Sequence, residues 1–169
     1  MEFENTMIIS NRGRIHLEIF NANFVYGTHF DRRNPNRFGK TGIATIQIPE
    51  EFAAQLSAAQ VNTRCNTGTE EHPHDPIYSI QVIAKFDSDY DPPEINLVVP
   101  DPDGGIASMN QLDENTIGII DKIRTSKVEG EFDIAPNKNT GLPGGIYIKR
   151  MWVTQDLDSD PFAARYGVN

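Results

Sequence analysis

Alternation of hydrophobic and polar positions predicts several short β-strands. Residues 14–20 alternate isoleucine and leucine with charged or polar side chains, the period of a half-buried strand, and the apolar run extends towards Phe24 and Val25. Residues 41–48 are rich in β-branched side chains and indicate a second strand. Further strands are expected at 77–86, 95–99, 127–136 and 145–154, with a bulge or bend near Gly130.

Two short helices are expected between these strands. Pro49 and the two glutamates after it are typical of a helix start, and Phe52 and Leu56 share one stripe of the helix that follows. Asp113 is a candidate cap for a second helix over 114–123. Residues 62–76 are polar and interrupted by glycine and proline, so we expect a loop there.

The element order suggests a known small fold. If the first helix and the 95–99 strand are insertions, the remaining order is β-β-β-α-β-β, the order of the OB-fold. That fold is a five-stranded β-barrel that binds oligonucleotides or oligosaccharides through strands 2 and 3 and the loops joining strands 1 to 2 and 4 to 5. We therefore expect a mainly β, OB-fold-like five-stranded β-barrel with one or two short helices over residues 1–155. An acidic C-terminal tail follows over 156–169.

Composition narrows the class of protein. With 169 residues the chain is long enough for one hydrophobic core. It contains no apolar run of membrane-spanning length, and its N-terminus lacks the pattern of a signal peptide, so we expect a cytoplasmic protein without a membrane partner. The single cysteine, Cys65, excludes an internal disulfide.

Charge is distributed unevenly along the chain. The net charge is −9, which by itself argues against nucleic acid as a ligand. Residues 10–49, however, hold six Lys and Arg against two Asp and Glu, and the segment GTHFDRRNPNRFGKTG, 27–42, is the densest basic cluster. A local basic patch attracts phosphate whatever the total charge of the protein.

On the OB-fold assignment this basic segment is the first binding loop, and residues 137–145 form the second. Cations beside aromatic rings suit single-stranded nucleic acid, because the cation meets phosphate while a ring stacks on a base, at about 1–3 kcal/mol per base. The predicted phosphate contacts are Arg12, Arg14, Arg32, Arg33, Arg37 and Lys40. The predicted stacking rings are Phe30 and Phe38, and Lys85, Tyr147 and Lys149 are expected to line the same groove.

Several segments together resemble the single-stranded DNA-binding proteins of tailed bacteriophages. They are IPEEFAAQL, LDENTIGIIDKI, VEGEFDIAPN, GIYIKRMWVTQD and the terminal DPFAARY, and the resemblance covers most of residues 13–166. It implies an OB-fold protein of the host cytoplasm that coats single strands during phage DNA replication and recombination.

The acidic tail is a candidate contact for other proteins. The resemblance implies that replication proteins bind it, through Asp156, Asp158, Asp160 and Phe162. In related proteins the tail ends at a phenylalanine, whereas here Phe162 is followed by AARYGVN, which weakens the recruitment role more than the DNA-binding role. The tail is equally consistent with a mimic of phosphate in the basic groove or with a clasp that docks on the barrel.

Catalytic and metal-binding interpretations have less support. Asp87, Asp89, Asp91 and Glu94 lack the spacing of a calcium loop, and Cys65, His72 and His74 lack a second cysteine pair for zinc. The chain has no nucleophile elbow. We expect a non-enzyme without a cofactor or metal. Two alternatives stay open, a protein-interaction or virion-associated β-barrel and a metal-dependent nuclease built on the aspartate turn.

Overall fold

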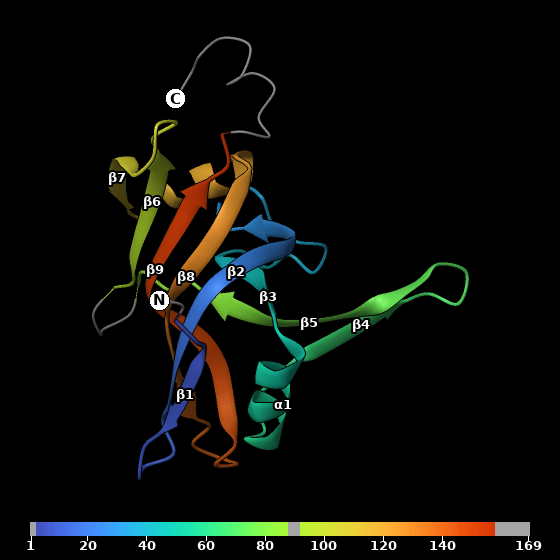
Figure 1. Ribbon diagram of the computed structural model, residues 1–169. Helices are drawn as coiled ribbons and strands as arrows, with labels where there is room; N and C mark the ends of the chain where they lie inside the picture. The colour runs from blue at the N-terminus through green and yellow to red at the C-terminus, as the bar shows by residue number, and fades with distance from the viewer. Residues whose placement is uncertain (1–2, 88–91, 158–169) are drawn as a thin grey trace.

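The computed structural model describes residues 3–87 and 92–157 and has a mainly β fold (Figure 1). In chain order the elements are β1 (Thr6–Ile9), β2 (Ile15–His29), β3 (Ile43–Ile48), α1 (Glu50–Ala58), β4 (Arg64–Gly68), β5 (Pro73–Ile83), β6 (Glu94–Pro100), β7 (Ile106–Leu112), the 3-10 helix η1 (Ile117–Lys122), β8 (Thr125–Pro136) and β9 (Pro143–Gln155). In the described ranges no helix has both the length and the apolar character needed to cross a membrane.

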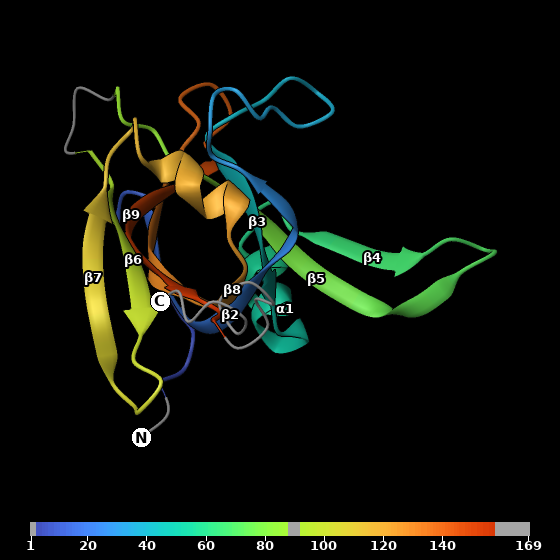
Figure 2. The same ribbon diagram turned by 90° about the horizontal axis from the view of Figure 1, so that it is seen from above.

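Five strands close into a ring in the order β2, β3, β5, β9, β8 and back to β2 (Figure 2). The long strand β2 closes it, because its second half pairs with β3 and its first half pairs with β8. All neighbours in the ring are antiparallel except β5 and β9, which pair in parallel at Val82↔Ile146 and Ile83↔Tyr147. Four strands lie outside the ring: β1 pairs with β2, β4 with β5, β6 with β9, and β7 with β6.

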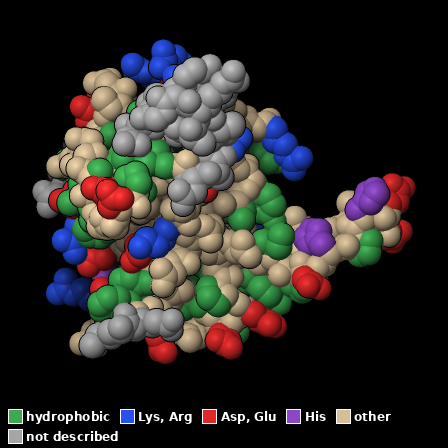
Figure 3. Space-filling model, turned by 45° about the horizontal axis from the view of Figure 1, so that its top comes forward, with side chains coloured by type: hydrophobic (Ala, Val, Ile, Leu, Met, Phe, Trp, Pro, Cys, Tyr) green, Lys and Arg blue, Asp and Glu red, His purple; other side chains and the backbone are tan. Residues whose placement is uncertain are grey.

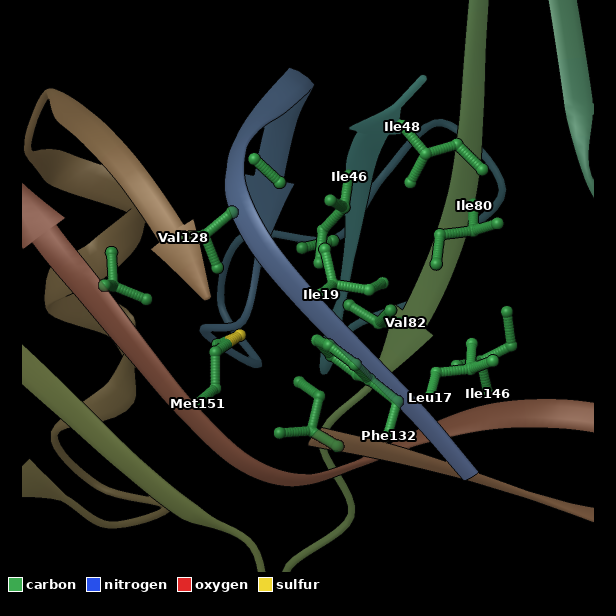
Figure 4. Close-up of a cluster of buried hydrophobic side chains, with 14 of the residues drawn as sticks. Leu17, Ile19, Ile46, Ile48, Ile80, Val82, Val128, Phe132, Ile146 and Met151 are labelled. Atoms are coloured by element: carbon green, nitrogen blue, oxygen red, sulfur yellow. The ribbon is translucent and has the colours of Figure 1, made fainter. Parts of the chain in front are cut away.

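The hydrophobic core fills the ring (Figure 4). It consists of the inward side chains of the alternating strands, including Leu17, Ile19, Ile46, Ile80, Val82, Phe132, Ile134, Ile146 and Met151, all 3% exposed or less. Helix α1 adds Phe52 and Leu56 to the same cluster. The period-2 pattern of residues 14–20 therefore predicted correctly which face of this part of β2 is buried.

Most of the predicted elements are confirmed, but the three short strands β1, β4 and β7 were missed. Residues 62–76, expected to be a loop, contain β4 and the first part of β5, which form a hairpin projecting from the ring (Figures 1 and 2). Strand β7 follows the turn at residues 100–105. Almost every side chain of β4, and of β5 up to Pro76, is exposed, as is most of β7. Without a buried face these strands have no hydrophobic alternation, and only backbone pairing defines them.

The second helix is shorter than predicted. It is a 3-10 helix over Ile117–Lys122, and its N-cap is Thr116. Asp113 instead accepts hydrogen bonds from the backbone N–H groups of Asn115 and Thr116 in the turn before it. The predicted irregularity near Gly130 is present, but the extra residues lie in β2 and β9, the two strands that pair with β8. The β2–β8 register shifts between Ile19 and Ala22, and the β8–β9 register shifts between Glu131 and Phe132.

Candidate nucleic-acid interface

The basic loop, residues 30–42, joins β2 to β3 and is held by one carboxylate from η1. Asp121 Oδ1 accepts hydrogen bonds from the Thr28 hydroxyl at 2.6 Å and from the Phe30 backbone N–H at 3.0 Å. Asp121 Oδ2 accepts them from the Asp31 backbone N–H at 2.8 Å and from the Asn34 amide at 3.2 Å. The start of the loop is therefore fixed in place, as a binding site built on a loop requires.

A glycine in η1 permits this close approach. A Cβ atom on Gly118 would lie 2.5 Å from Asp31 Oδ2, so any larger residue would force the Asp31 side chain to move. At the other end of the loop, the Gly42 N–H donates to the His29 carbonyl at 2.7 Å, and the Ala84 N–H donates to the Gly42 carbonyl at 2.7 Å. Both ends of the basic loop are thus tied to the ring.

Phe30 is not available for base stacking, contrary to the prediction. Its side chain is 4% exposed and packs edge-on against Phe24, with ring centroids 6.1 Å apart. The position of Phe30 at the start of the loop explains this burial. The two backbone N–H groups bound to Asp121 hold residues 30 and 31 against η1, and Phe30 faces inward like Phe24 in β2. Phe30 is a core anchor of the loop.

Phe38, by contrast, is 70% exposed, as a stacking role requires. Asn36 builds the turn beneath it, because Asn36 Oδ1 accepts hydrogen bonds from the Phe38 and Lys40 backbone N–H groups, each at 2.9 Å. The Arg37 guanidinium lies 4.8 Å from the centre of the Phe38 ring. The tip of the loop therefore presents an ordered aromatic ring with a cation on it.

The four cations of the loop are not equivalent. The Arg33 side chain donates to both carboxylate oxygens of Asp31, at 3.2 and 3.1 Å. This hydrogen bonding lowers the pKa of Asp31 from 3.8 to about 2. Arg32, Arg37 and Lys40 are exposed, and no described residue forms an ion pair with any of them. These three are the cations available for phosphate.

The other predicted groove residues divide into two places. The Ile83↔Tyr147 pairing sets the end of β5, two residues before Lys85, beside the segment of β9 that carries Tyr147 and Lys149. The Ala84 N–H donates a hydrogen bond to the Gly42 carbonyl at the end of the basic loop. Arg12 and Arg14 lie at the opposite end of β2, where Gly13 approaches Pro136 at the end of β8. The basic stretch of the sequence is therefore not one patch, and Figure 3 shows the basic side chains of one face in small separate groups.

The predicted tail and aspartate turn lie largely outside the described residues. Asp156 is described, and its backbone N–H donates to the Arg124 carbonyl at 2.8 Å. Asp158, Asp160 and Phe162 of the tail, and Asp89 and Asp91 of the aspartate turn, are not described. Cys65, His72 and His74 lie on the β4–β5 hairpin, and their ligand atoms do not converge on one point in the described structure.

A second charged surface, the acidic strip, consists of His16 and Glu18 on β2 with Glu131 and Asp133 on β8. His16 Nδ1 lies 3.0 Å from Asp133 Oδ1, and the Arg150 Nε–H donates to Glu131 Oε2 at 3.2 Å. One potential ligand atom each of His16, Glu18 and Glu131 lie within 4.8 Å of one another. In the strip the Arg150 cation is paired with Glu131, whereas three of the four cations of the basic loop form no ion pair with a described residue.

Sequence reasoning missed two features of the interface. Asp121 is distant in sequence from the loop it holds, and a lone aspartate near a helix end carries no signal of such a role. Tyr26, beside the loop, has an unusual backbone φ of 63° and lines a pocket with β4 and Ser79. Only the Tyr-Gly pair at 26–27 in an otherwise regular strand was a visible sign of irregularity.

Comparison with protein-family models, with curated proteins and with solved structures gives no match to this chain.

Proposed function

We propose that this chain is a single-stranded DNA-binding protein with an OB-fold, which binds with little sequence preference. In this proposal β2, β3, β5, β8 and β9 are strands 1 to 5 of the fold, and α1, the β4–β5 hairpin and the β6–β7 hairpin are additions to it. The order of the ring strands and the parallel pairing of strands 3 and 5, the one parallel pair within the ring, support this assignment. The basic loop is then the loop between strands 1 and 2, which OB-folds use for oligonucleotides.

The observation that carries the proposal is the basic loop itself. Arg32, Arg37 and Lys40 are exposed without ion pairs to described residues, and Phe38 is presented beside them on a turn built by Asn36. Phosphate attraction and stacking on an exposed ring are the two interactions that sequence-tolerant binding of single strands needs. Because Asp121 and Phe30 hold the loop before any ligand arrives, little ordering entropy is lost on binding.

The biological setting follows from the sequence resemblance. We propose that the protein acts in the host cytoplasm during phage DNA replication and recombination, and that it protects and organises displaced single strands. The acidic tail, with Asp156, Asp158, Asp160 and Phe162, is the proposed contact for replication proteins. Neither a metal nor a cofactor has a part in this mechanism.

Fluorescence anisotropy with labelled oligo-dT, a duplex of equal length and labelled poly-glutamate tests the proposal. We expect the affinity to be highest for oligo-dT, intermediate for the duplex, and lowest for poly-glutamate, because only the single strand offers both phosphates and unstacked bases. The affinity for oligo-dT should fall as salt rises.

The two alternatives give different results in the same assay. Equal binding of oligo-dT and poly-glutamate would favour a surface for acidic protein partners over a DNA-binding site. Magnesium-dependent cleavage of the oligonucleotide would identify a nuclease. Absence of oligo-dT binding at low salt would reject the proposal.

A further inference from the structure

A strained bulge in β2 turns one tyrosine out of the sheet. The β2–β3 register shifts between Val25 and Thr28, and Tyr26 and Gly27, the residues in between, have φ angles of 63° and 78°. A left-handed backbone is unusual for a bulky residue, and residues with this conformation are often found at functional sites. Bulges of this kind redirect side chains. Tyr26 is 54% exposed, and its hydroxyl accepts a hydrogen bond from Asn66 of β4 at 3.0 Å.

The tyrosine, strand β4 and Ser79 of β5 line an open surface pocket. Its volume is about 450 Å³, and it is lined by Tyr26, residues 64–68 and Ser79. This volume is within the range of small-molecule sites, about 300–1,000 Å³. The lining contains a guanidinium, hydroxyls, an amide and an aromatic ring, and none of its residues is acidic. Such a pocket suits a ligand with a negative charge and a planar ring.

A buried hydroxyl at this pocket has no hydrogen-bond partner. Ser79 is 1% exposed, and its Oγ atom finds no donor or acceptor among the described residues. Ser79 pairs with Arg64 of β4 and with Gln47 of β3, and directly paired residues share one face of a sheet. Buried polar groups in folded proteins are rarely left unsatisfied, so an orphan hydroxyl in a pocket wall points to a ligand.

The pocket is next to the basic loop because Tyr26 lies near the end of β2, just before the loop begins. Gly27 is followed by Thr28, whose hydroxyl donates to Asp121, the residue that also anchors the start of the basic loop. Tyr26 is therefore two residues from the point at which Asp121 holds the start of the basic loop.

We propose that this pocket binds one nucleotide of the single strand, an inference that rests on the proposed function of the basic loop. The Arg64 guanidinium holds the phosphate, the face of Tyr26 stacks on the base, and the Ser79 hydroxyl bonds to a polar edge of the nucleotide. The β4–β5 hairpin then extends the binding surface beyond the basic loop.

Two probes, dTMP and oligo-dT, test the proposal. Amide NMR of the intact protein should show dTMP shifting the signals of Asn66, Gly68 and Ser79. Arg64→Gln should weaken dTMP binding about tenfold, the loss expected for one charge-assisted hydrogen bond. Ser79→Ala should weaken it severalfold without lowering the melting temperature, since the removed hydroxyl has no partner within the described protein. Lys127→Gln, an exposed lysine paired with Glu129 on β8, is the matched control and should change nothing.

The results separate this inference from the proposed function. If oligo-dT binds the wild type but dTMP shifts none of these amides, or if Arg64→Gln and Ser79→Ala bind dTMP as the wild type does, the pocket proposal is overturned and the basic loop stands. If dTMP binds in the pocket while oligo-dT fails to bind, the pocket is a site for free nucleotides, and both the single-strand function and the proposal that the pocket holds one nucleotide of a strand are rejected. A melting temperature that drops with Ser79→Ala would contradict the orphan hydroxyl and overturn the assigned role of Ser79.

Discussion

The basic loop and the acidic strip both lie on the outside of the ring, yet they treat charge in opposite ways. In the strip, His16 faces Asp133 and Arg150 bonds to Glu131. Among the described residues only Arg33 of the four loop cations forms an ion pair; Arg32, Arg37 and Lys40 are exposed, and Arg37 lies over the Phe38 ring. Charges that already have partners contribute little to stability at a surface and little to recognition, whereas unpaired cations on an ordered loop attract an anionic ligand.

The largest expected effect comes from removing the anchor that makes the loop ordered. Phe30→Ala should lower the free energy of unfolding by about 3–5 kcal/mol, the usual range for a buried phenylalanine. Denaturant unfolding followed by circular dichroism measures it. A loss below about 1 kcal/mol would contradict the anchoring role and would remove the distinction between Phe30 and Phe38.

Asp121→Ala should lower the free energy of unfolding by about 2 kcal/mol, because backbone N–H groups of Phe30 and Asp31 lose a charged acceptor. Asp103→Ala in the β6–β7 turn changes the net charge equally and is the control. If affinity for oligo-dT rises equally in both variants and stability falls in neither, Asp121 acts only through its charge and does not position the loop.

Phe38→Ala tests the same comparison through the affinity for oligo-dT. Affinity for oligo-dT should fall by about 1–3 kcal/mol, because the ring is lost to stacking, while the melting temperature stays within about a degree or two of the wild type. Anisotropy titration and thermal unfolding on the same samples measure both. A lowered melting temperature with intact affinity would assign Phe38 to packing.

Replacing Arg32, Arg37 and Lys40 with glutamine should flatten the slope of log K against log salt by about 2 units, at about 0.7 per phosphate contact on single strands. Arg33 is left in place because Asp31 already pairs with it. Glu18→Gln combined with Glu131→Gln on the acidic strip is the contrasting variant and should leave the slope unchanged. A changed slope in the strip variant would show that DNA crosses the β2–β8 face.

The smallest effect concerns the Arg33–Asp31 ion pair of the loop. Arg33 lowers the pKa of Asp31 from 3.8 to about 2 in the folded state. A depressed folded-state pKa adds stability that is complete above the unfolded value and is lost as pH falls through the folded value. The melting temperature of the wild type should therefore decrease more steeply than that of Asp31→Asn between about pH 4 and pH 2. Parallel curves would show that the pair contributes nothing measurable.

Phe30 and Phe38 illustrate how far the sequence predicts the site. Both rings lie in a polar loop, and local sequence does not distinguish them. Phe30 is six residues beyond Phe24 and continues the inward face of β2, a relation visible only if the strand is extended past residue 25. Phe38 is exposed, as predicted, because a turn built by Asn36 holds it away from the ring of strands.

The β4–β5 hairpin shows a different limit. Its strands are exposed on nearly all sides, so no hydrophobic period distinguishes them from a loop. Strand β5 continues outward beyond the ring, and its backbone pairing with β4 forms the hairpin. The pocket at the base of this hairpin could not be predicted for the same reason, since Tyr26 and Ser79 belong to segments that meet only after the sheet has closed.

By itself, the sequence determined which segments are strands with a buried face, where the helix after β3 begins, and where basic charge is concentrated. These properties are local, since side-chain alternation and turn residues act over a few positions. The tertiary structure alone decided that β2 closes the ring against both β3 and β8, that Asp121 holds the basic loop, and that Arg12 and Arg14 lie away from it. Each of these depends on contacts between residues far apart in the chain, where the gain of packing and hydrogen bonding outweighs the entropy of bringing distant segments together.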